Sequence, residues 1–214
     1  MTIVITGASR GIGATLAVQY KGAGEEVIGT ARGAGAEAVL DVTDPASHTA
    51  FAASLADRPL DLLICNAGVY LDKGDDLDAG FGPDLWAHSF ATNVTGVFLT
   101  VQSLLPNLRA AKGAKIAIIA SQMGSQTRAP GGSYIYRASK AAVINLGRNL
   151  AVDLKPEGIA VGIYHPGWVR TDMGGDQGEI SVTESAQGLA KRIAALDLAQ
   201  TGAFETWDGR AHPF

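Results

Sequence analysis

The chain has 214 residues, of which 47% are hydrophobic and 18% are charged, and its formal net charge is −4. This length and composition are typical of one globular domain that buries a sheet on both faces, and the chain lacks the basic excess expected of proteins that bind nucleic acid or anionic membranes. Its single cysteine cannot form an internal disulfide, and no group of Cys and His has zinc-ligand spacing, so we expect no metal site.

The N-terminus shows no targeting pattern. Met1 leads into an apolar run without a basic stretch before it, and no apolar stretch approaches the roughly 18 residues that span a membrane. We therefore expect a soluble, cytoplasmic protein whose partners include neither a membrane nor a nucleic acid.

Short apolar segments rich in β-formers alternate with helical patterns. The predicted strands cover residues 2–6, 26–31, 38–42, 60–66, 114–121, 159–165 and 203–207. Apolar residues at three and four spacing predict helices over residues 12–20, 46–55, 84–108, 133–154 and 183–196. This alternation predicts an α/β fold with three layers: a doubly wound (Rossmann), mostly parallel, seven-stranded sheet with helices on both faces. We expect residues 1–214 to form one dinucleotide-binding domain, with loops at 72–82 and 173–180.

The first strand runs into the glycine-rich segment "TGASRGIG", residues 6–13. Glycine inside a strand or helix costs roughly 0.5–1 kcal/mol relative to alanine, so a cluster at a strand-to-helix junction needs a backbone reason. Gly7 would permit the tight turn, Gly11 would let the backbone approach a pyrophosphate, and Gly13 would allow close helix packing. The alternative is a tight turn that binds nothing.

The second strand ends at Ala31 and is followed by Arg32. An acidic residue in this place would bind the adenosine ribose of NAD and repel a 2′-phosphate. Arg32, together with Arg10 of the glycine turn, would favour the phosphate through a charged planar fork. We therefore predict that NADP(H) is preferred over NAD(H). The alternative is that both arginines are solvated surface charges.

Polar residues also follow the third and fourth strands. Asp41 in "LDVTD" falls where an adenine would lie, although an Asp there is more often a helix cap. Asn66 in "CNAG" ends the fourth strand on the same edge of the sheet, and by itself this tetrapeptide is typical of a strand-ending turn. Cys65 is small and apolar in character, and we interpret it as a packing residue rather than a nucleophile.

The segment "YRASK" places Tyr136 and Lys140 four residues apart. On a helix this spacing puts both side chains on one face, with Cβ atoms about 5–6 Å apart. An unperturbed tyrosine has a pKa near ~10, and a neighbouring positive charge can lower the pKa of an acid by roughly 1–3 units. Tyr136 could then act as a general acid or base. The alternative is a surface Tyr and Lys on an amphipathic helix.

Taken together, the motifs resemble those of the short-chain dehydrogenase/reductase family. They run in that family's order over essentially the whole chain: "TGASRGIG", "DVTD", "CNAG", "NVTG", "IIASQMG", "YRASK" and "HPGWVRTDM". The short chain, "SQMGS" and the ending "TGAFETWDGRAHPF" are similar to the C-factor-like branch of the family, and the stretch after Thr171 indicates a trimmed substrate lid.

The resemblance implies a catalytic tetrad of Asn93, Ser121, Tyr136 and Lys140. Tyr136 would donate the proton and Ser121 would hydrogen-bond the substrate carbonyl. Lys140 would hold the nicotinamide ribose and lower the pKa of Tyr136, and Asn93 would support a water that leads protons to Lys140. Asn93 as a helix cap and Ser121 as a strand end are the alternatives.

The predicted cofactor contacts extend along the whole cofactor, and Thr171 would reach the nicotinamide carboxamide unless it only caps its loop. The predicted cofactor-binding residues are Gly7, Ser9, Arg10, Gly11, Ile12, Gly13, Arg32, Asp41, Val42, Asn66, Ala67, Gly68, Tyr136, Lys140, Pro166, Gly167, Val169 and Thr171.

These features predict an oxidoreductase that transfers a hydride between NADPH and a small aldehyde or ketone. The alternative is a dinucleotide-binding signalling or regulatory protein of the C-factor-like type, in which turnover is incidental. A complete tetrad favours the enzyme, because binding alone does not need one.

Apolar residues occupy more than one face of two predicted helices. They are Val97, Val101, Leu104, Val143, Leu146 and Leu150. One contact with a sheet does not require so many, and by resemblance these helices would pair with their symmetry mates in a four-helix interface. We therefore predict a homodimer or homotetramer. The alternative is that the same residues are simply core.

Overall fold

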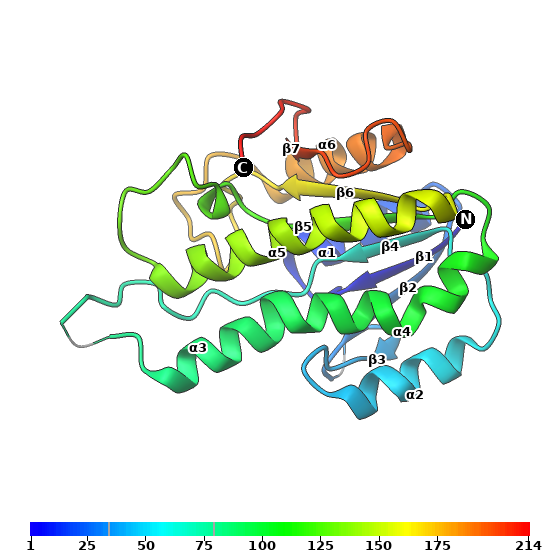
Figure 1. The fold of residues 1–214 in the computed structure, drawn as a ribbon, viewed down its shortest axis with the longest axis horizontal. Helices are drawn as coiled ribbons and strands as arrows, with labels where there is room; N and C mark the ends of the chain where they lie inside the picture. Colours follow the sequence, from blue (N-terminus) through cyan, green and yellow to red (C-terminus); the bar gives the residue numbers. More distant parts are fainter. Residues whose placement is uncertain (34, 79) are drawn as a thin grey trace.

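The computed structural model of the protein describes residues 1–33, 35–78 and 80–214 (Figure 1). Within these residues the strands are β1 (Thr2–Thr6), β2 (Glu26–Ala31), β3 (Ala38–Val39), β4 (Leu62–Cys65), β5 (Lys115–Ile119), β6 (Ala160–His165) and β7 (Phe204–Thr206). They form one sheet in the order β3-β2-β1-β4-β5-β6-β7, and each neighbouring pair is parallel. The predicted doubly wound fold is confirmed.

Helices cover both faces of this sheet. They are α1 (Gly11–Gly22), α2 (Pro45–Leu55), α3 (Pro83–Phe90), α4 (Gly96–Ala110), α5 (Tyr134–Leu154) and α6 (Val182–Ala195). Alternate strand residues point to opposite faces, so Ile3 and Ile5 pack with α1 and α6, whereas Val4 packs with α2, α4 and α5. Because both faces are buried, the strands read as continuous apolar runs.

The strand order reverses between β1 and β4, and their carboxyl ends are tied together. The Asn66 side-chain amide donates to the carbonyl oxygens of Thr6 and Gly7, each at 3.0 Å. The Thr6 hydroxyl in turn accepts the backbone N–H groups of Asn66 and Ala67, again at 3.0 Å. In open α/β sheets the ligand crevice lies at such a reversal, and the glycine turn occupies this one.

The predicted helix over residues 84–108 is continuous but irregular, because its α-helical hydrogen bonding changes in the middle. α3 and α4 are joined without a break by a π-helical turn at Ala91–Thr95, which contains Asn93. Single π-turns are rare in proteins and are frequently found at functional sites, so this irregularity marks Asn93 independently of its motif. Pro106 lies in the last part of α4.

The apolar residues behind the prediction of an oligomer are explained by the chain's own packing. Val97, Val101, Leu104 and Val143 are buried in the core, and Leu146 and Leu150 pack against it. The core alternative therefore accounts for Val97, Val101, Leu104 and Val143, whereas Leu146 and Leu150 are only partly buried. The oligomer itself stays a prediction.

The long connections lie beyond the carboxyl ends of the strands. Residues 173–180 form turns, as predicted, and the same is true of the predicted loop 72–82 except for Ala79, which lies outside the described residues. Among helices of the described ranges, none has the length and apolar character to cross a membrane.

Candidate active site

A cleft of about 490 Å³ extends from the glycine turn to the first turns of α5. The predicted residues that line it are Gly7, Ser9, Arg10, Gly11, Ile12, Arg32, Asp41, Val42, Asn66, Ala67, Gly68, Tyr136, Lys140, Pro166 and Thr171. Segments from all parts of the chain therefore meet in one cleft. Gly13, Val169, Gly167, Asn93 and Ser121 are not part of its wall.

The glycine turn has a backbone that other residues adopt with strain. Gly7 and Gly11 have φ values of +67° and +56°. A Cβ atom at Gly13 would lie 2.3 Å from the carbonyl oxygen of Gly7, so helix α1 can approach the turn only because residue 13 has no side chain. The three glycines thus have the backbone roles expected of a phosphate-binding turn.

The two predicted arginines differ in their surroundings. Arg10 donates to Asp172 at 2.6 Å, which joins the glycine turn to the loop after β6 across the cleft. Arg32 is exposed at the mouth of the cleft and makes no ion pair within the described residues. Arg32 is therefore the freer of the two to meet a phosphate, whereas Arg10 has a competing partner that the sequence did not indicate.

Asp41 lies at the same end of the cleft, just beyond β3. Its carboxylate accepts the backbone N–H of Thr43 at 2.9 Å and the Thr43 hydroxyl at 2.7 Å. The backbone hydrogen bond from Thr43 is the main reason that the pKa of Asp41 is lowered. The cap of α2 is Asp44 instead, so the helix-cap alternative for Asp41 is wrong.

Tyr136 and Lys140 lie one turn apart on the inner face of α5, and both are buried. The Lys140 ammonium donates to the carbonyl oxygen of Ile119 at 3.0 Å and lies 5.6 Å from the centre of the Tyr136 ring. Burial lowers the pKa of Lys140 to about 8, so the ammonium stays protonated at neutral pH. The alternative of an exposed Tyr and Lys pair is therefore wrong.

The acidity of Tyr136 differs from the expectation. Burial raises its pKa to about 12; the hydrogen bond with Ser121 opposes this rise, while Tyr70 and Asp72 add to it. The expected net lowering of the Tyr136 pKa is thus wrong for the protein without ligands, because desolvation of the phenolate dominates, whereas the lowering contribution of Lys140 stays a prediction.

Asn93 holds the start of the loop after β4 against α5. Its side-chain amide donates to the Val69 carbonyl oxygen at 2.9 Å and to the Ser139 hydroxyl at 3.0 Å, and its oxygen accepts the Val69 N–H at 2.8 Å. Both N–H groups of the amide and one lone pair of its oxygen are thus engaged by protein. The helix-cap alternative is wrong, and the predicted water relay stays a prediction.

Two residues that the sequence motifs did not indicate surround Tyr136. The Tyr70 ring stacks on the Tyr136 ring with centroids 4.3 Å apart, and its hydroxyl is hydrogen-bonded to Ser133. Asp72 is fully buried and accepts the backbone N–H groups of Ile135 and Tyr136. An aspartate in an apparently polar loop gives no signal of burial. Cys65, by contrast, is buried as predicted, which raises the pKa of its thiol to about 12.

Known proteins share both the sequence pattern and the fold. A sequence model described as short chain dehydrogenase matches residues 1–182. The chain belongs to this family. C-signal from Myxococcus xanthus is 36% identical over 169 residues, which cover 77% of this chain and 99% of that protein. The 1-hydroxy-2-glutathionyl-2-methyl-3-butene dehydrogenase of Rhodococcus sp. is 34% identical, with 97% of each chain covered.

Solved structures of carbonyl reductases resemble this short-chain dehydrogenase closely. The NADPH-bound carbonyl reductase from chicken fatty liver has a TM-score of 0.91 and 30% identity, covering 100% of this chain and 98% of that one. The carbonyl reductase Sniffer of D. melanogaster has a TM-score of 0.92 and 27% identity, with 100% and 99% covered. The chain therefore has the fold of a short-chain oxidoreductase.

The cleft fits a nicotinamide dinucleotide at both of its ends. The positive-φ glycines leave the backbone N–H groups at the start of α1 uncovered by side chains, which suits a pyrophosphate. At the other end, only one hydrogen bond of the Lys140 ammonium goes to protein among the described residues, so its remaining N–H groups are available to ribose hydroxyls.

Proposed function

We propose that this short-chain dehydrogenase is a cytoplasmic, NADPH-dependent reductase of small aldehydes or ketones, with Tyr136 as the proton donor. The observation that carries the proposal is the position of Tyr136 and Lys140 in the same cleft as the glycine turn. Structural similarity to carbonyl reductases, one of them NADPH-bound, supports the same activity.

A bound nicotinamide dinucleotide supplies the hydride for such a reduction. Negative charge then develops on the substrate oxygen, and the Tyr136 hydroxyl donates its proton to that oxygen. Ser121 holds the oxygen against Tyr136 through its own hydroxyl. The Lys140 ammonium stabilises the tyrosinate that remains, and this interaction is stronger in a buried site than in water.

The proposed preference for NADPH rests on Arg32. The position after β2 carries no acid that would repel a 2′-phosphate, and the guanidinium lies at the mouth of the cleft beside Asp41. A planar guanidinium binds phosphate oxygens through two parallel hydrogen bonds.

The test is to mix the purified protein with NADPH or NADH and a broad panel of aldehydes and ketones, and to follow cofactor oxidation by absorbance. We expect turnover of some carbonyls, with a higher kcat/KM for NADPH. Tight NADPH binding without turnover of any carbonyl would contradict the proposal. That result would favour the regulatory alternative, for which the similarity to C-signal is the specific observation.

We also propose that the enzyme is a homodimer or homotetramer. Apolar side chains that stay exposed on α4 and α5, which include Phe98 and Val152, support this assembly. Light scattering at micromolar concentration measures the mass directly, and a monomer would overturn this part.

A further inference from the structure

A second cavity of about 220 Å³ lies at the carboxyl ends of β6 and β7. The two cavities share no lining residue, but the side of each that faces the strand ends contains residues close together in the chain. Gln122 in its wall follows Ser121, and Gly167 in its wall follows Pro166 of the cofactor cleft. We call this second cavity the side chamber.

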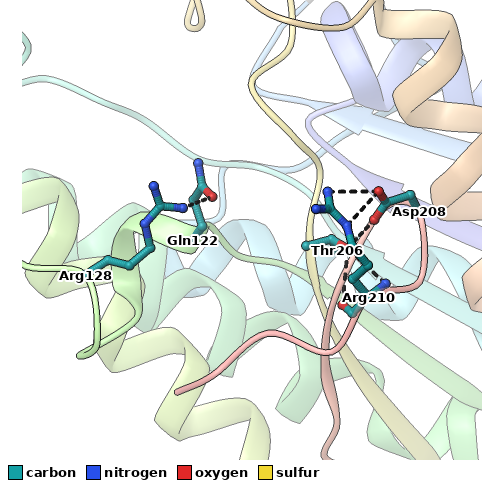
Figure 2. Close-up of polar contacts among 5 residues, drawn as sticks. All are labelled: Gln122, Arg128, Thr206, Asp208 and Arg210. Carbon is teal, nitrogen blue, oxygen red and sulfur yellow. Dashed lines mark hydrogen bonds and ion pairs between the residues drawn. The ribbon is translucent and has the colours of Figure 1, made fainter.

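Two arginines from distant segments line the side chamber, and Figure 2 shows them with their partners. Arg128 comes from the loop after β5 and donates only to the neutral side-chain oxygen of Gln122. Arg210 comes from the C-terminal segment and is paired with Asp208 through Nε and Nη2, each 2.9 Å from the carboxylate. Within the described residues, Arg128 thus has no carboxylate partner.

Both arginines are mounted on braced segments. Arg137 of α5 donates to the carbonyl oxygens of Gly132 at 3.1 Å and of Arg128 at 3.3 Å, which fixes the loop. On the opposite side, the Thr206 hydroxyl accepts the Arg210 backbone N–H at 3.1 Å and also contacts Asp208 (Figure 2). Both arginine side chains are exposed, but the backbone of each segment is held in place, which lowers the entropic cost of ordering the segment around an anion.

His165 forms part of the floor of the side chamber and is only 7% exposed. Its buried Nδ1 has no hydrogen-bond partner in the part of the chain that the structure describes. Burial, together with smaller contributions from His212, Arg128 and Arg210, lowers the pKa of His165 to about 4, and Asp208 opposes this shift. Arg128 and Arg210 therefore place positive charge near this imidazole.

We propose that the side chamber is an anion-binding subsite that receives the carboxylate end of an oxo-acid substrate, while the carbonyl end lies at Tyr136. The proposal rests on the proposed reductase function. Arg128 would bind the carboxylate. Gln122, which lines the chamber and follows Ser121 in the chain, would lie between the carboxylate and the carbonyl ends of the substrate. Glu179 is the acid in the wall, and it would weaken an anion's binding.

The first experiment measures binding without catalysis. The probe is succinate, with succinamide as its neutral analogue, and the readout is the NMR shift of the indole N–H groups of Trp168 and Trp207, which line the chamber. We expect succinate to shift both signals and succinamide to shift neither, with Trp86 of α3 as the internal reference.

Variants assign the binding to the chamber. Arg128→Met should weaken succinate binding about tenfold, because it removes a charge-assisted hydrogen bond. Glu179→Gln should strengthen the binding, whereas Arg58→Met, an exposed arginine paired with Glu26 elsewhere, should leave it unchanged. Equal binding by the Arg128→Met variant and the parent would overturn the proposal, and so would the absence of any succinate-induced shift.

The second experiment measures turnover of ω-oxo acids of increasing length against aldehydes of the same length that lack the carboxylate. We expect one length to be preferred, and Arg128→Met to raise KM for that acid about tenfold with little change in kcat or in the aldehyde's KM. Turnover of aldehydes with no gain from a carboxylate would overturn the subsite and leave the reductase intact. Succinate binding without any turnover would instead sustain the subsite and contradict the reductase.

Discussion

The carboxylate of Asp72 caps the helix that carries Tyr136. Its oxygens lie 2.8 Å from the backbone nitrogen of Ile135 and 3.2 Å from that of Tyr136. The helix has no local side-chain cap, because the hydroxyl of Ser133 is engaged by Tyr70. A residue from the loop after β4 therefore fixes the start of α5 and places a negative charge beside the proposed proton donor.

The first prediction concerns the Asp72→Asn variant, which keeps an oxygen for the cap but removes the charge. Burial is the largest cause of the raised pKa of Tyr136, and the charge of Asp72 adds to it. The variant should therefore have a lower Tyr136 pKa. Because proton donation needs protonated Tyr136, the basic limb of the pH profile of kcat should move to lower pH.

The control for this variant is Asp78→Asn, an exposed change in the same loop. The weaker cap should also cost about 1 kcal/mol in the free energy of unfolding, which urea denaturation measures. A loss of stability with an unchanged pH profile would mean that Asp72 is structural only.

The fold could be predicted from the sequence because its signals are local and repeated. The central strands β1, β4, β5 and β6 are apolar runs, and the glycine turn needs its positive-φ backbone conformation. The motifs of the glycine turn, Asn66 and Tyr136 also follow the chain order, so their shared cleft follows from the sheet topology.

Residues whose role depends on a distant partner could not be predicted in the same way. Asp72 and Ile135 are 63 positions apart, and Arg10 and Asp172 are 162 apart. Nothing in the composition of a polar loop distinguishes a buried aspartate from a solvated one. The acidity of Tyr136 was mispredicted for a related reason, because helical spacing reports the nearby cation but not the loss of water around the phenol.

The second prediction is that Tyr136→Phe removes turnover and leaves the fold intact. The change deletes one oxygen and preserves the ring that stacks on Tyr70. General acid catalysis contributes roughly 10²–10⁴-fold, and kcat for any carbonyl that the parent reduces should fall by at least that much. NADPH binding, measured by fluorescence titration, should survive.

Tyr134 provides the matched control for Tyr136. It lies on the same helix but is exposed and packs against Phe81. Tyr134→Phe should retain the parent's kcat. Turnover by Tyr136→Phe within a few-fold of the parent would show that another group donates the proton.

The third prediction is that Asp172 competes with the cofactor for Arg10. Their ion pair is exposed on both sides, and such pairs contribute about 0.2–1 kcal/mol. Asp172→Asn should therefore tighten NADPH binding, by about two- to fivefold, and NADH binding much less. Competition titrations with both cofactors measure this, and Asp176→Asn in the same loop is the control.

The fourth prediction is that Arg32, rather than Arg10, makes the main contact with the 2′-phosphate of NADPH. Arg32→Ala should weaken NADPH binding about tenfold and leave NADH binding nearly unchanged, because only NADPH carries the 2′-phosphate. The ratio of kcat/KM for the two cofactors is the measurement. An unchanged ratio would place the phosphate away from Arg32.

The last prediction is that Lys140→Met stabilises the free protein while it removes activity. The ordinary pKa of a lysine is 10.5, and burial lowers that of Lys140 to about 8, which corresponds to a destabilisation on the order of 3 kcal/mol. Loss of the hydrogen bond to the Ile119 carbonyl offsets about 1 kcal/mol of the gain, so the free energy of unfolding should rise by about 2 kcal/mol at neutral pH.

The pH dependence identifies the cause of that stabilisation. Between about pH 8 and 10.5 the unfolded chain binds more protons at Lys140 than the folded chain, so the parent gains stability as pH rises through this window. Lys140→Met lacks the group, so its advantage over the parent should shrink across the same window. Urea denaturation at neutral pH and near pH 10 measures both values, with the exposed Lys112→Met as the control. A variant less stable than the parent at neutral pH would show that the buried ammonium is fully compensated.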